Sequence, residues 1–282
     1  MYQMVKYLSI AALPIGGCGQ MFRIIQDYRQ GKEDIFFYRG LKDVPKKTEQ
    51  WTQNIMRQCG IEPIPIRQRP GNNPNIFGTY ADSAILMSSA ASDDIENRLS
   101  KDHLTSEDIR ELDGKVFAIK HEVGHHFYRH VFKSIGAAIA IPTAIQGMSS
   151  MVSYACTKAF NIQQPKTKIS TFSRGSLLML ALFLKERAWT VADIYYKHHQ
   201  ENQADDFALA HATPSEIAAA IDFFEHKECE FLRWYVENNP NCDIGQVWWG
   251  HFFMGGRHPY PGDQAIKAKK YLEKSKQRHF DD

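Results

Sequence analysis

The feature that most constrains the fold of this chain is the segment His121-Glu122-Val123-Gly124-His125. Two histidines four residues apart lie on one face of an α-helix, one turn above the other, so both imidazoles can bind a single Zn²⁺. Glu122 lies about 100° around the helix and therefore reaches a water on the metal rather than the metal itself. There its carboxylate can act first as a general base and then as a general acid.

The residues around this segment predict one long helix over 104–132. Thr105 is the expected N-cap, and Asp108 closes a capping box three residues later. Apolar residues recur at steps of three and four and are expected to share a buried face: Ile109, Leu112, Val116, Ile119, Val123 and Phe127. A helix that buried two histidines and a glutamate without a metal would leave polar groups unpaired, which favours the metal site.

A catalytic zinc requires a third protein ligand, and Glu201 is the candidate, 76 residues after His125. It lies in a second long helix that is predicted over 184–211. Asp205 follows four residues later on the same helical face, where it can accept a hydrogen bond from a ligating imidazole. Ala204 is small enough to let the two helices pack closely. The alternative third ligand is one of the neighbouring histidines: His198, His199 and His211.

Other features of the chain restrict the possible folds and the classes of molecule that it could bind. The 282 residues carry a net charge of +2, which gives no basic excess of the kind that binds nucleic acid. Five cysteines without a CxxC pair argue against a thiolate zinc site and against a disulfide-rich scaffold. Prolines and glycines between residues 61 and 90 predict short strands and turns ahead of the first long helix. A helix capped at Thr213, with Pro214 in its first turn and Glu216 closing a capping box, and a lysine-rich surface helix near the C-terminus complete the chain.

Two segments leave the relation to a membrane open. Residues 1–20 resemble a bacterial lipoprotein signal with Cys18 as the lipidated residue, or else form a packed N-terminal segment; residues 21–282 are expected to be a single domain. Residues 134–184 predict an apolar helical hairpin that either dips into a membrane or covers a cleft. A signal would place the protein in the bacterial periplasm or at a membrane, through Cys18 or the hairpin; otherwise it is cytosolic or secreted.

The two motifs together resemble those of a metalloendopeptidase family, the gluzincins that include the type I CAAX prenyl endopeptidase, the HtpX heat-shock protease and the Oma-type proteases. "KHEVGHHFYRH" is similar to the first metal-binding helix of that family, and "ENQADDFALAH" is similar to the second. "GGRHPYPGDQAIKAKKYLE" is similar to its late His-Pro segment. The resemblance covers well under half of the chain.

This resemblance implies an α+β, mostly α-helical zincin-like metallopeptidase domain, with a small sheet before the HExxH helix. It implies one Zn²⁺ per chain held by His121, His125 and Glu201, with Glu122 as the catalytic acid and base that activates a zinc-bound water. It further implies that His258 stabilises the transition state. The expected reaction is hydrolysis of peptide bonds in a protein or peptide substrate. The segment "NIFGTYADSA" differs from the edge strand of the family, so docking of the substrate by strand addition there is only one option.

Two rival interpretations keep the metal but not the reaction. In the first, the protein is a metal-binding chaperone-like or latent interaction protein, with its cleft plugged by the hairpin, His126 or His258. In the second, a fourth side chain closes the zinc site, which is then structural. The intact Glu122 favours the enzyme, because a binding protein has no use for the base. His126 and His130 are otherwise expected on the helix flank, facing solvent or hydrogen-bonded.

Overall fold

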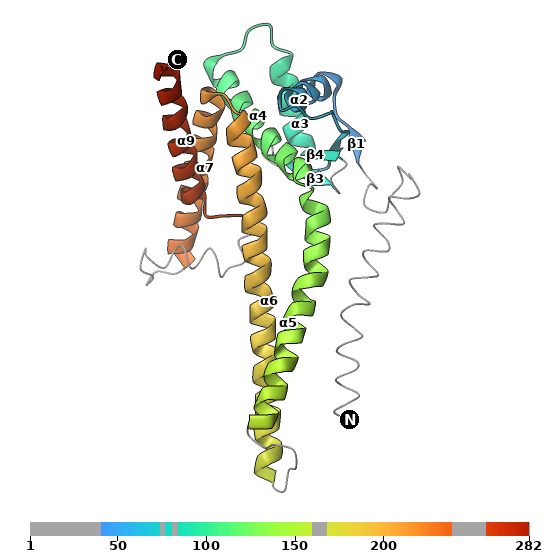
Figure 1. Ribbon diagram of the computed structural model, residues 1–282. Coiled ribbons are helices and arrows are strands. Elements are labelled where there is room, and N and C mark those ends of the chain that lie inside the picture. Colours follow the sequence, from blue (N-terminus) through green and yellow to red (C-terminus); the bar gives the residue numbers. More distant parts are fainter. Residues whose placement is uncertain (1–40, 74–76, 81–83, 160–167, 239–257, 282) are drawn as a thin grey trace. The chain divides into compact units, whose positions relative to one another are not determined.

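The computed structural model describes residues 41–73, 77–80, 84–159, 168–238 and 258–281 (Figure 1). The predicted signal-like segment 1–20, with Cys18, lies outside these residues. The chain separates into two compact units. The described residues of one lie within Lys133–Tyr196, and those of the other lie within Phe36–Phe132 and Lys197–Asp282.

A small four-stranded sheet precedes the motif-bearing helix, as predicted. Its strands are β1 (Lys42–Asp43), β2 (Ile66–Arg69), β3 (Phe77–Tyr80) and β4 (Ala84–Ser88), in the spatial order β1-β2-β4-β3. β4 pairs in parallel with β2 and antiparallel with β3, while β1 pairs antiparallel with β2. β4 is a central strand whose residues are mostly buried, and β3 forms one edge of the sheet.

The first hydrophobic core lies between this sheet and three helices: α2 (Lys46–Gln58), α3 (Ser89–Leu99) and α4 (Ser106–Phe127). The sheet contributes Ile85 and Met87, which are fully buried. α4 contributes Ile119 and Val123, from the same helix face as was predicted from their spacing. Helix α4 is therefore fixed on the sheet through residues two positions away from its histidines.

Helix α4 begins at the predicted cap. The Thr105 hydroxyl accepts a hydrogen bond from the backbone of Asp108, and the Asp108 carboxylate accepts one from the backbone of Thr105. Its predicted end is wrong, because the chain turns at Arg129, which has a left-handed φ of 53°. A non-glycine residue in that region breaks the helical hydrogen-bond pattern, so a new helix starts one residue later. The two end members of the predicted buried face, Ile109 and Phe127, are also exposed.

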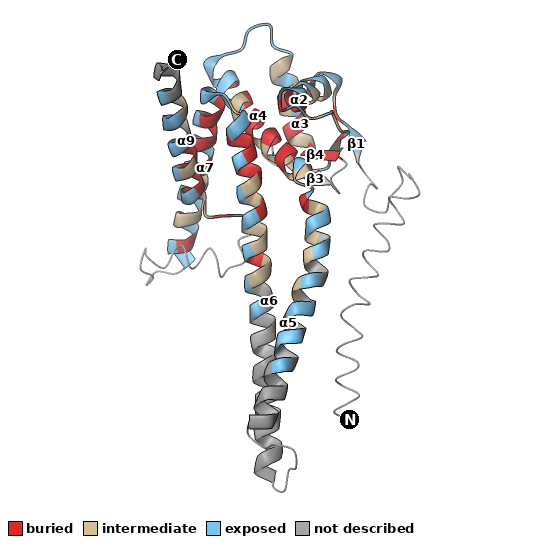
Figure 2. Ribbon diagram, in the orientation of Figure 1, coloured by how far each residue is buried: buried red, intermediate tan, exposed pale blue. Residues whose placement is uncertain are grey.

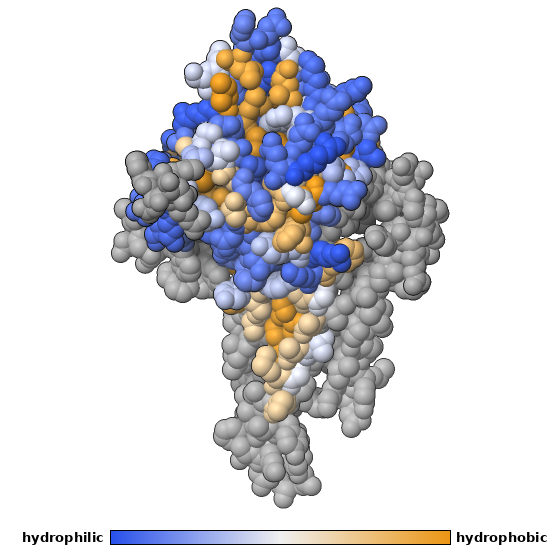
Figure 3. Space-filling view, turned by 45° about the horizontal axis from the view of Figure 1, so that its top comes forward, coloured by the Kyte–Doolittle hydropathy of each residue, from blue (hydrophilic) through white to orange (hydrophobic). Residues whose placement is uncertain are grey.

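The two helices that follow are α5 (His130–Ala159) and α6 (Lys168–His211). The uncharged stretch from Ser134 is helical, as predicted, and its described surface is largely apolar in Figure 3. The prediction of a separate helix over 184–211 is wrong, since α6 runs without a break from the apolar segment into the motif that contains Glu201. No Pro or Gly interrupts residues 176–211, so nothing local ends the helix there. Within the described part of the chain, no helix has both the length and the apolar character needed to cross a membrane.

Helices α7 (Pro214–Asn238) and α9 (Pro261–Asp281) form the second core with α4 and the end of α6. The capping box of α7 is present: the Glu216 carboxylate accepts from the backbone of Thr213 at 2.9 Å, and the Thr213 hydroxyl accepts in return. α9 was predicted as a surface helix, and it is one only in part. Ala265 and Ala268 are buried against α7, while Lys269, Lys270 and Lys274 are exposed. Figure 2 shows this mixture of buried and exposed positions along α9.

A buried ion pair connects the two cores. Lys120 of α4 donates to the Glu216 carboxylate at 2.6 Å and to the carbonyl of His211 at 2.8 Å. Both charged side chains are almost inaccessible to solvent. Because Lys120 precedes His121 directly, the pair fixes the motif helix against the start of α7.

Candidate metal centre

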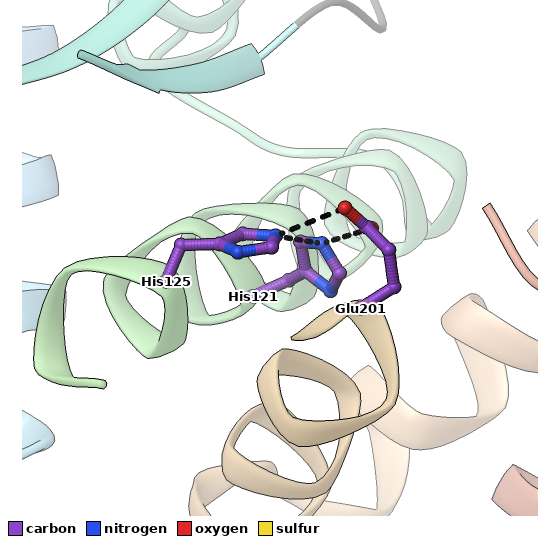
Figure 4. Close-up of side chains that lie close together, drawn as sticks. All are labelled: His121, His125 and Glu201. Atoms are coloured by element: carbon purple, nitrogen blue, oxygen red, sulfur yellow. Dashed lines mark hydrogen bonds and ion pairs between the residues drawn. The ribbon is translucent and has the colours of Figure 1, made fainter. Parts of the chain in front are cut away.

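The predicted ligand atoms meet at one point. His121 and His125 project from α4, and Glu201 projects from α6 toward them (Figure 4). The Nε2 atoms of the two histidines are 3.0 Å apart, and the Glu201 carboxylate oxygens lie 3.3 Å from the Nε2 of His121 and 3.5 Å from that of His125. Among the described residues, this is the group of histidine, cysteine and carboxylate side chains that could hold a metal ion.

These separations fit zinc. A tetrahedral Zn²⁺ with bonds of roughly 2.0–2.1 Å places neighbouring ligand atoms roughly 3.3–3.4 Å apart. The chemistry of the donors also fits, because two imidazole nitrogens and a carboxylate are all acceptors when the histidines are neutral, and acceptors converge only around a proton or a cation. The described residues could supply three ligands, which is the number found at catalytic zinc sites that keep a fourth position open.

Asp205, four residues after Glu201, lies beside His121. Its carboxylate lies 2.8 Å from the Nδ1 of His121, so Nδ1 carries a hydrogen and Nε2 is directed at the centre. The second Asp205 oxygen accepts a hydrogen bond from Gln264 at 2.8 Å. Gln264 belongs to the first turn of α9 and was missed by the sequence reasoning, because an amide six residues after His258 carries no recognisable pattern.

The electrostatics of the metal-free cluster are those of an anion between imidazoles. Burial disfavours the charged form of Glu201, but hydrogen bonds from His121, His125 and His258 outweigh it and hold the pKa of this carboxyl well below its usual range. Burial likewise opposes the charged form of His121, yet its bonds to Asp205 and Glu201 raise the pKa of this imidazole well above its usual value. The cluster thus attracts positive charge, as a proton or as a metal ion.

Close contact between α4 and α6 brings the ligands together. A Cβ added to Gly124 would lie 3.0 Å from the Cα of Ala204, 3.1 Å from its carbonyl oxygen and 3.1 Å from the Cβ of Phe207. The expectation that Ala204 permits close packing is therefore confirmed, and Gly124 is its partner in the contact. Gly124 lies three residues after His121, and Ala204 lies three residues after Glu201, so each side of the contact shares a helix face with a candidate ligand.

Glu122 does not belong to the ligand group and instead faces a cleft of about 1440 Å³ between α4 and α7. The cleft is also lined by His121, at the metal centre, and by His258. One wall is aromatic and is formed by Phe117 of α4 and by side chains of α7: Phe223, Phe224, Phe231 and Trp234. Charged residues of the same two helices lie among them, including Arg110 paired with Asp222.

His258 lies at the edge of the centre. Its Nδ1 is 2.7 Å from a Glu201 carboxylate oxygen, and its side chain remains 69% exposed. The bond to Glu201 raises the pKa of His258 above its usual value. The residue predicted from the late His-Pro segment is therefore brought to the centre from a distant part of the chain.

The other histidines near the two motifs lie outside the group of candidate metal ligands. His211, one of the alternative ligands, bonds to the carbonyl of Phe207 and stacks on its ring, so it is turned away from the centre. His198 and His199 also lie outside the ligand group. Of the pair expected on the helix flank, His126 is partly exposed, whereas His130 is buried and lies within hydrogen-bonding distance of His125.

Comparison with known protein families gives a match to the model of peptidase family M48 over residues 100–262, more than half of the chain. This range begins just before α4 and ends at the first turn of α9, so it includes His121, Glu122, His125, Glu201, Asp205 and His258, while Gln264 lies two residues beyond it. No curated protein and no solved structure gives a significant match. The family resemblance seen in the motifs is confirmed, with its α+β, zincin-like fold and its zinc-dependent peptidase activity. The chain belongs to peptidase family M48, a family of zinc metalloproteases.

Proposed function

We propose that the protein is an endopeptidase of the HExxH…ExxxD gluzincin type, which cleaves peptide bonds within a protein substrate. His121, His125 and Glu201 would hold one Zn²⁺, and Glu122 would be the catalytic acid and base. The observation that carries this proposal is the convergence of the three ligand atoms at the side of the cleft that Glu122 also lines. Two of the three proposed metal ligands and the proposed catalytic carboxylate are therefore neighbours on helix α4.

When bound, zinc polarises the scissile carbonyl and lowers the pKa of water toward ~7. Glu122 takes a proton from the attacking water as the new carbon–oxygen bond forms. It then delivers this proton to the amide nitrogen as the carbon–nitrogen bond breaks, so the carboxylate is regenerated and the products are a carboxylic acid and an amine. His258, on the rim of the same cleft, is suited to donate a hydrogen bond to the oxygen of the carbonyl that is attacked.

The lining of the cleft indicates which substrates it accepts. The side chains of Phe223 and Trp234 are exposed there, which favours burial of apolar side chains of the substrate. β3 is an edge strand whose Phe77 also lines the cleft, and this supports docking of an extended substrate by strand addition. An open cleft beside the centre is suited to cleavage inside a polypeptide rather than at its end.

The test compares wild type with Glu122→Gln and Glu201→Ala, measuring zinc content and cleavage of casein and of a peptide library. We expect about one zinc per wild-type chain. Glu122→Gln should keep the zinc and lose at least about a hundredfold in cleavage, because general acid–base catalysis contributes roughly 10²–10⁴-fold. Glu201→Ala should lose zinc.

Cleavage by Glu122→Gln at the wild-type rate would refute the assigned role of this residue. Full zinc occupancy of Glu201→Ala would refute the ligand set. Wild-type protein with zinc but without cleavage of any substrate would favour the latent, plugged form over the protease.

A further inference from the structure

His130 is a buried histidine that the proposed reaction does not use. It is the first residue of α5, and only 3% of its surface is exposed. Its Nδ1 lies 2.7 Å from the Nδ1 of His125, and its Nε2 lies 3.0 Å from the Oε1 of Gln203. His130 thus lies between a predicted metal ligand on α4 and an amide on α6.

The ring of His130 is held firmly in this position. The left-handed turn at Arg129 directs it back toward α4. Its carbonyl accepts a hydrogen bond from the side chain of Gln200 at 2.9 Å, and its ring stacks on Tyr128 with the centroids 5.5 Å apart and the planes at 15°. The turn, the carbonyl bond and the stacked ring therefore fix both the backbone and the imidazole plane.

The proton positions along this chain of groups follow from the requirements of a ligand. Two nitrogens 2.7 Å apart share a single hydrogen. If His125 binds the ion through Nε2, its hydrogen must be on Nδ1, and His130 must accept that hydrogen at its own Nδ1. A neutral His130 then carries its hydrogen on Nε2, where the Oε1 of Gln203 accepts it. The opposite arrangement would place the hydrogen of His125 on the nitrogen that faces the metal.

We propose that His130 is a positioning residue for the metal centre: as a neutral imidazole it accepts a hydrogen bond from His125, and Gln203 fixes the tautomer that makes this possible. The inference rests on the proposed function, because it takes His125 as a ligand. The groups that accept a hydrogen bond from the other ring nitrogen of a ligating histidine are usually carboxylates, carbonyls or water, and their loss typically lowers metal affinity 10–100-fold.

The choice of a neutral partner has an electrostatic consequence. His121 is oriented by the anionic Asp205, and Glu201 is a second anion, so these two carboxylates balance the double charge of Zn²⁺. A carboxylate in place of His130 would add a further negative charge to this partly buried centre, beside which the Glu122 carboxylate already lies. A neutral imidazole orients His125 without that cost.

The test compares His130→Phe, which keeps a ring but removes the acceptor, with His130→Asn, whose amide oxygen can occupy the position of Nδ1. Zinc affinity is measured on the full-length protein by competition with a chromogenic chelator. We expect His130→Phe to bind zinc 10–100-fold more weakly, and His130→Asn to recover most of the affinity. His211→Phe, a histidine change on α6 outside the centre, is the control and should bind zinc as wild type does. Equal zinc affinity of wild type and His130→Phe would overturn the proposal.

A second measurement needs no substitution. Long-range ¹⁵N–¹H spectra of the histidine rings in the zinc-loaded protein should show His130 with hydrogen on Nε2 only and His125 with hydrogen on Nδ1. A hydrogen on the Nδ1 of His130 would overturn the inference even if His130→Phe failed to fold. Failure of the proposed function is separate, since it would appear as wild-type protein that binds no zinc or as Glu201→Ala that keeps it.

Discussion

Replacement of Gly124 by alanine tests whether the contact between α4 and α6 sets the geometry of the centre. The added Cβ would meet the Cα and carbonyl oxygen of Ala204 at 3.0 and 3.1 Å, and these are backbone atoms that cannot rotate away. Ordinary contact begins at 3.4 Å, so the helices must separate by about 0.4 Å at this point. That shift exceeds the ±0.2 Å within which metal–ligand distances normally lie.

The magnitude follows from two opposing effects. Alanine is better than glycine in a helix interior by about 1 kcal/mol, which favours the variant. Overpacking typically costs about 1–3 kcal/mol, so the net effect of Gly124→Ala on the free energy of unfolding lies between about zero and a loss of 2 kcal/mol. Gly114 lies on the same helix, and a Cβ there would meet Ala219 at an ordinary 3.9 Å. Gly114→Ala therefore has the higher helix propensity of alanine without an overpacking cost, and its free energy of unfolding should rise by about 1 kcal/mol.

The assay is denaturant unfolding of both alanine variants after removal of zinc, together with zinc competition against a chelator. The difference between Gly114→Ala and Gly124→Ala isolates the interhelical contact, because both variants gain the same helix preference. We expect a difference of about 1–3 kcal/mol in stability, and roughly tenfold weaker zinc binding by Gly124→Ala alone. Equal stabilisation of the two variants with unchanged zinc affinity would show that this contact does not set the geometry of the centre.

Three further changes test other parts of the argument. Asp205→Asn removes the anion behind His121 and should weaken zinc binding about 10–100-fold in chelator competition, while unchanged affinity would deny Asp205 its orienting role. Lys120→Met leaves Glu216 buried without its partner and should lower the free energy of unfolding, measured with denaturant, by about 3–5 kcal/mol. The double variant Lys120→Met/Glu216→Gln should recover much of this loss. A loss below about 1 kcal/mol in Lys120→Met would contradict a stabilising role of the buried pair. Hydrogen bonds, first from Lys101 and then from Thr105, hold the pKa of Asp108 well below its usual range. The ionised Asp108 therefore contributes its full stabilisation above about pH 4, and this is lost on further acidification. In metal-free protein the thermal midpoint of Asp108→Asn should therefore fall less between about pH 4 and pH 2 than that of wild type. Parallel curves of thermal midpoint against pH for the two proteins would exclude the effect.

What the sequence predicted best depends on local geometry. The spacing of His121 and His125 places both on one helix face whatever the rest of the fold does, and the cap at Thr105 depends only on residues within one turn. Glu201 and Asp205 share a face for the same reason. The meeting of these two pairs across 76 residues could be anticipated because both carry groups that one metal ion requires, and not because either segment specifies the other.

The parts that were missed depend on packing between distant segments. Nothing near Arg129 signals a left-handed residue, since neither glycine nor asparagine occurs there, so the break that brings His130 to His125 has no local cause in the sequence. Gln264 reaches Asp205 only because α9 packs against α6 and α7. Gln264 and His130 contact the candidate ligands or their partners through an amide and an imidazole, and both residue types are common on surface helices.

The metal and a proton are alternative occupants of the same position. In the metal-free protein Glu201 and His125 face the Nε2 of His121, and hydrogen bonds to Asp205 and Glu201 raise the pKa of His121 well above its usual value although burial opposes this, so the imidazole favours a second proton. Zinc must displace this proton, so uptake near neutral pH should release about one proton per ion, and affinity should fall as the pH is lowered. Calorimetric titration with zinc in two buffers of different ionisation enthalpy measures that number directly. Release of no proton would mean that His121 is already neutral, and that the contacts of α4 with α6, rather than charge, hold the three acceptors together until the metal arrives.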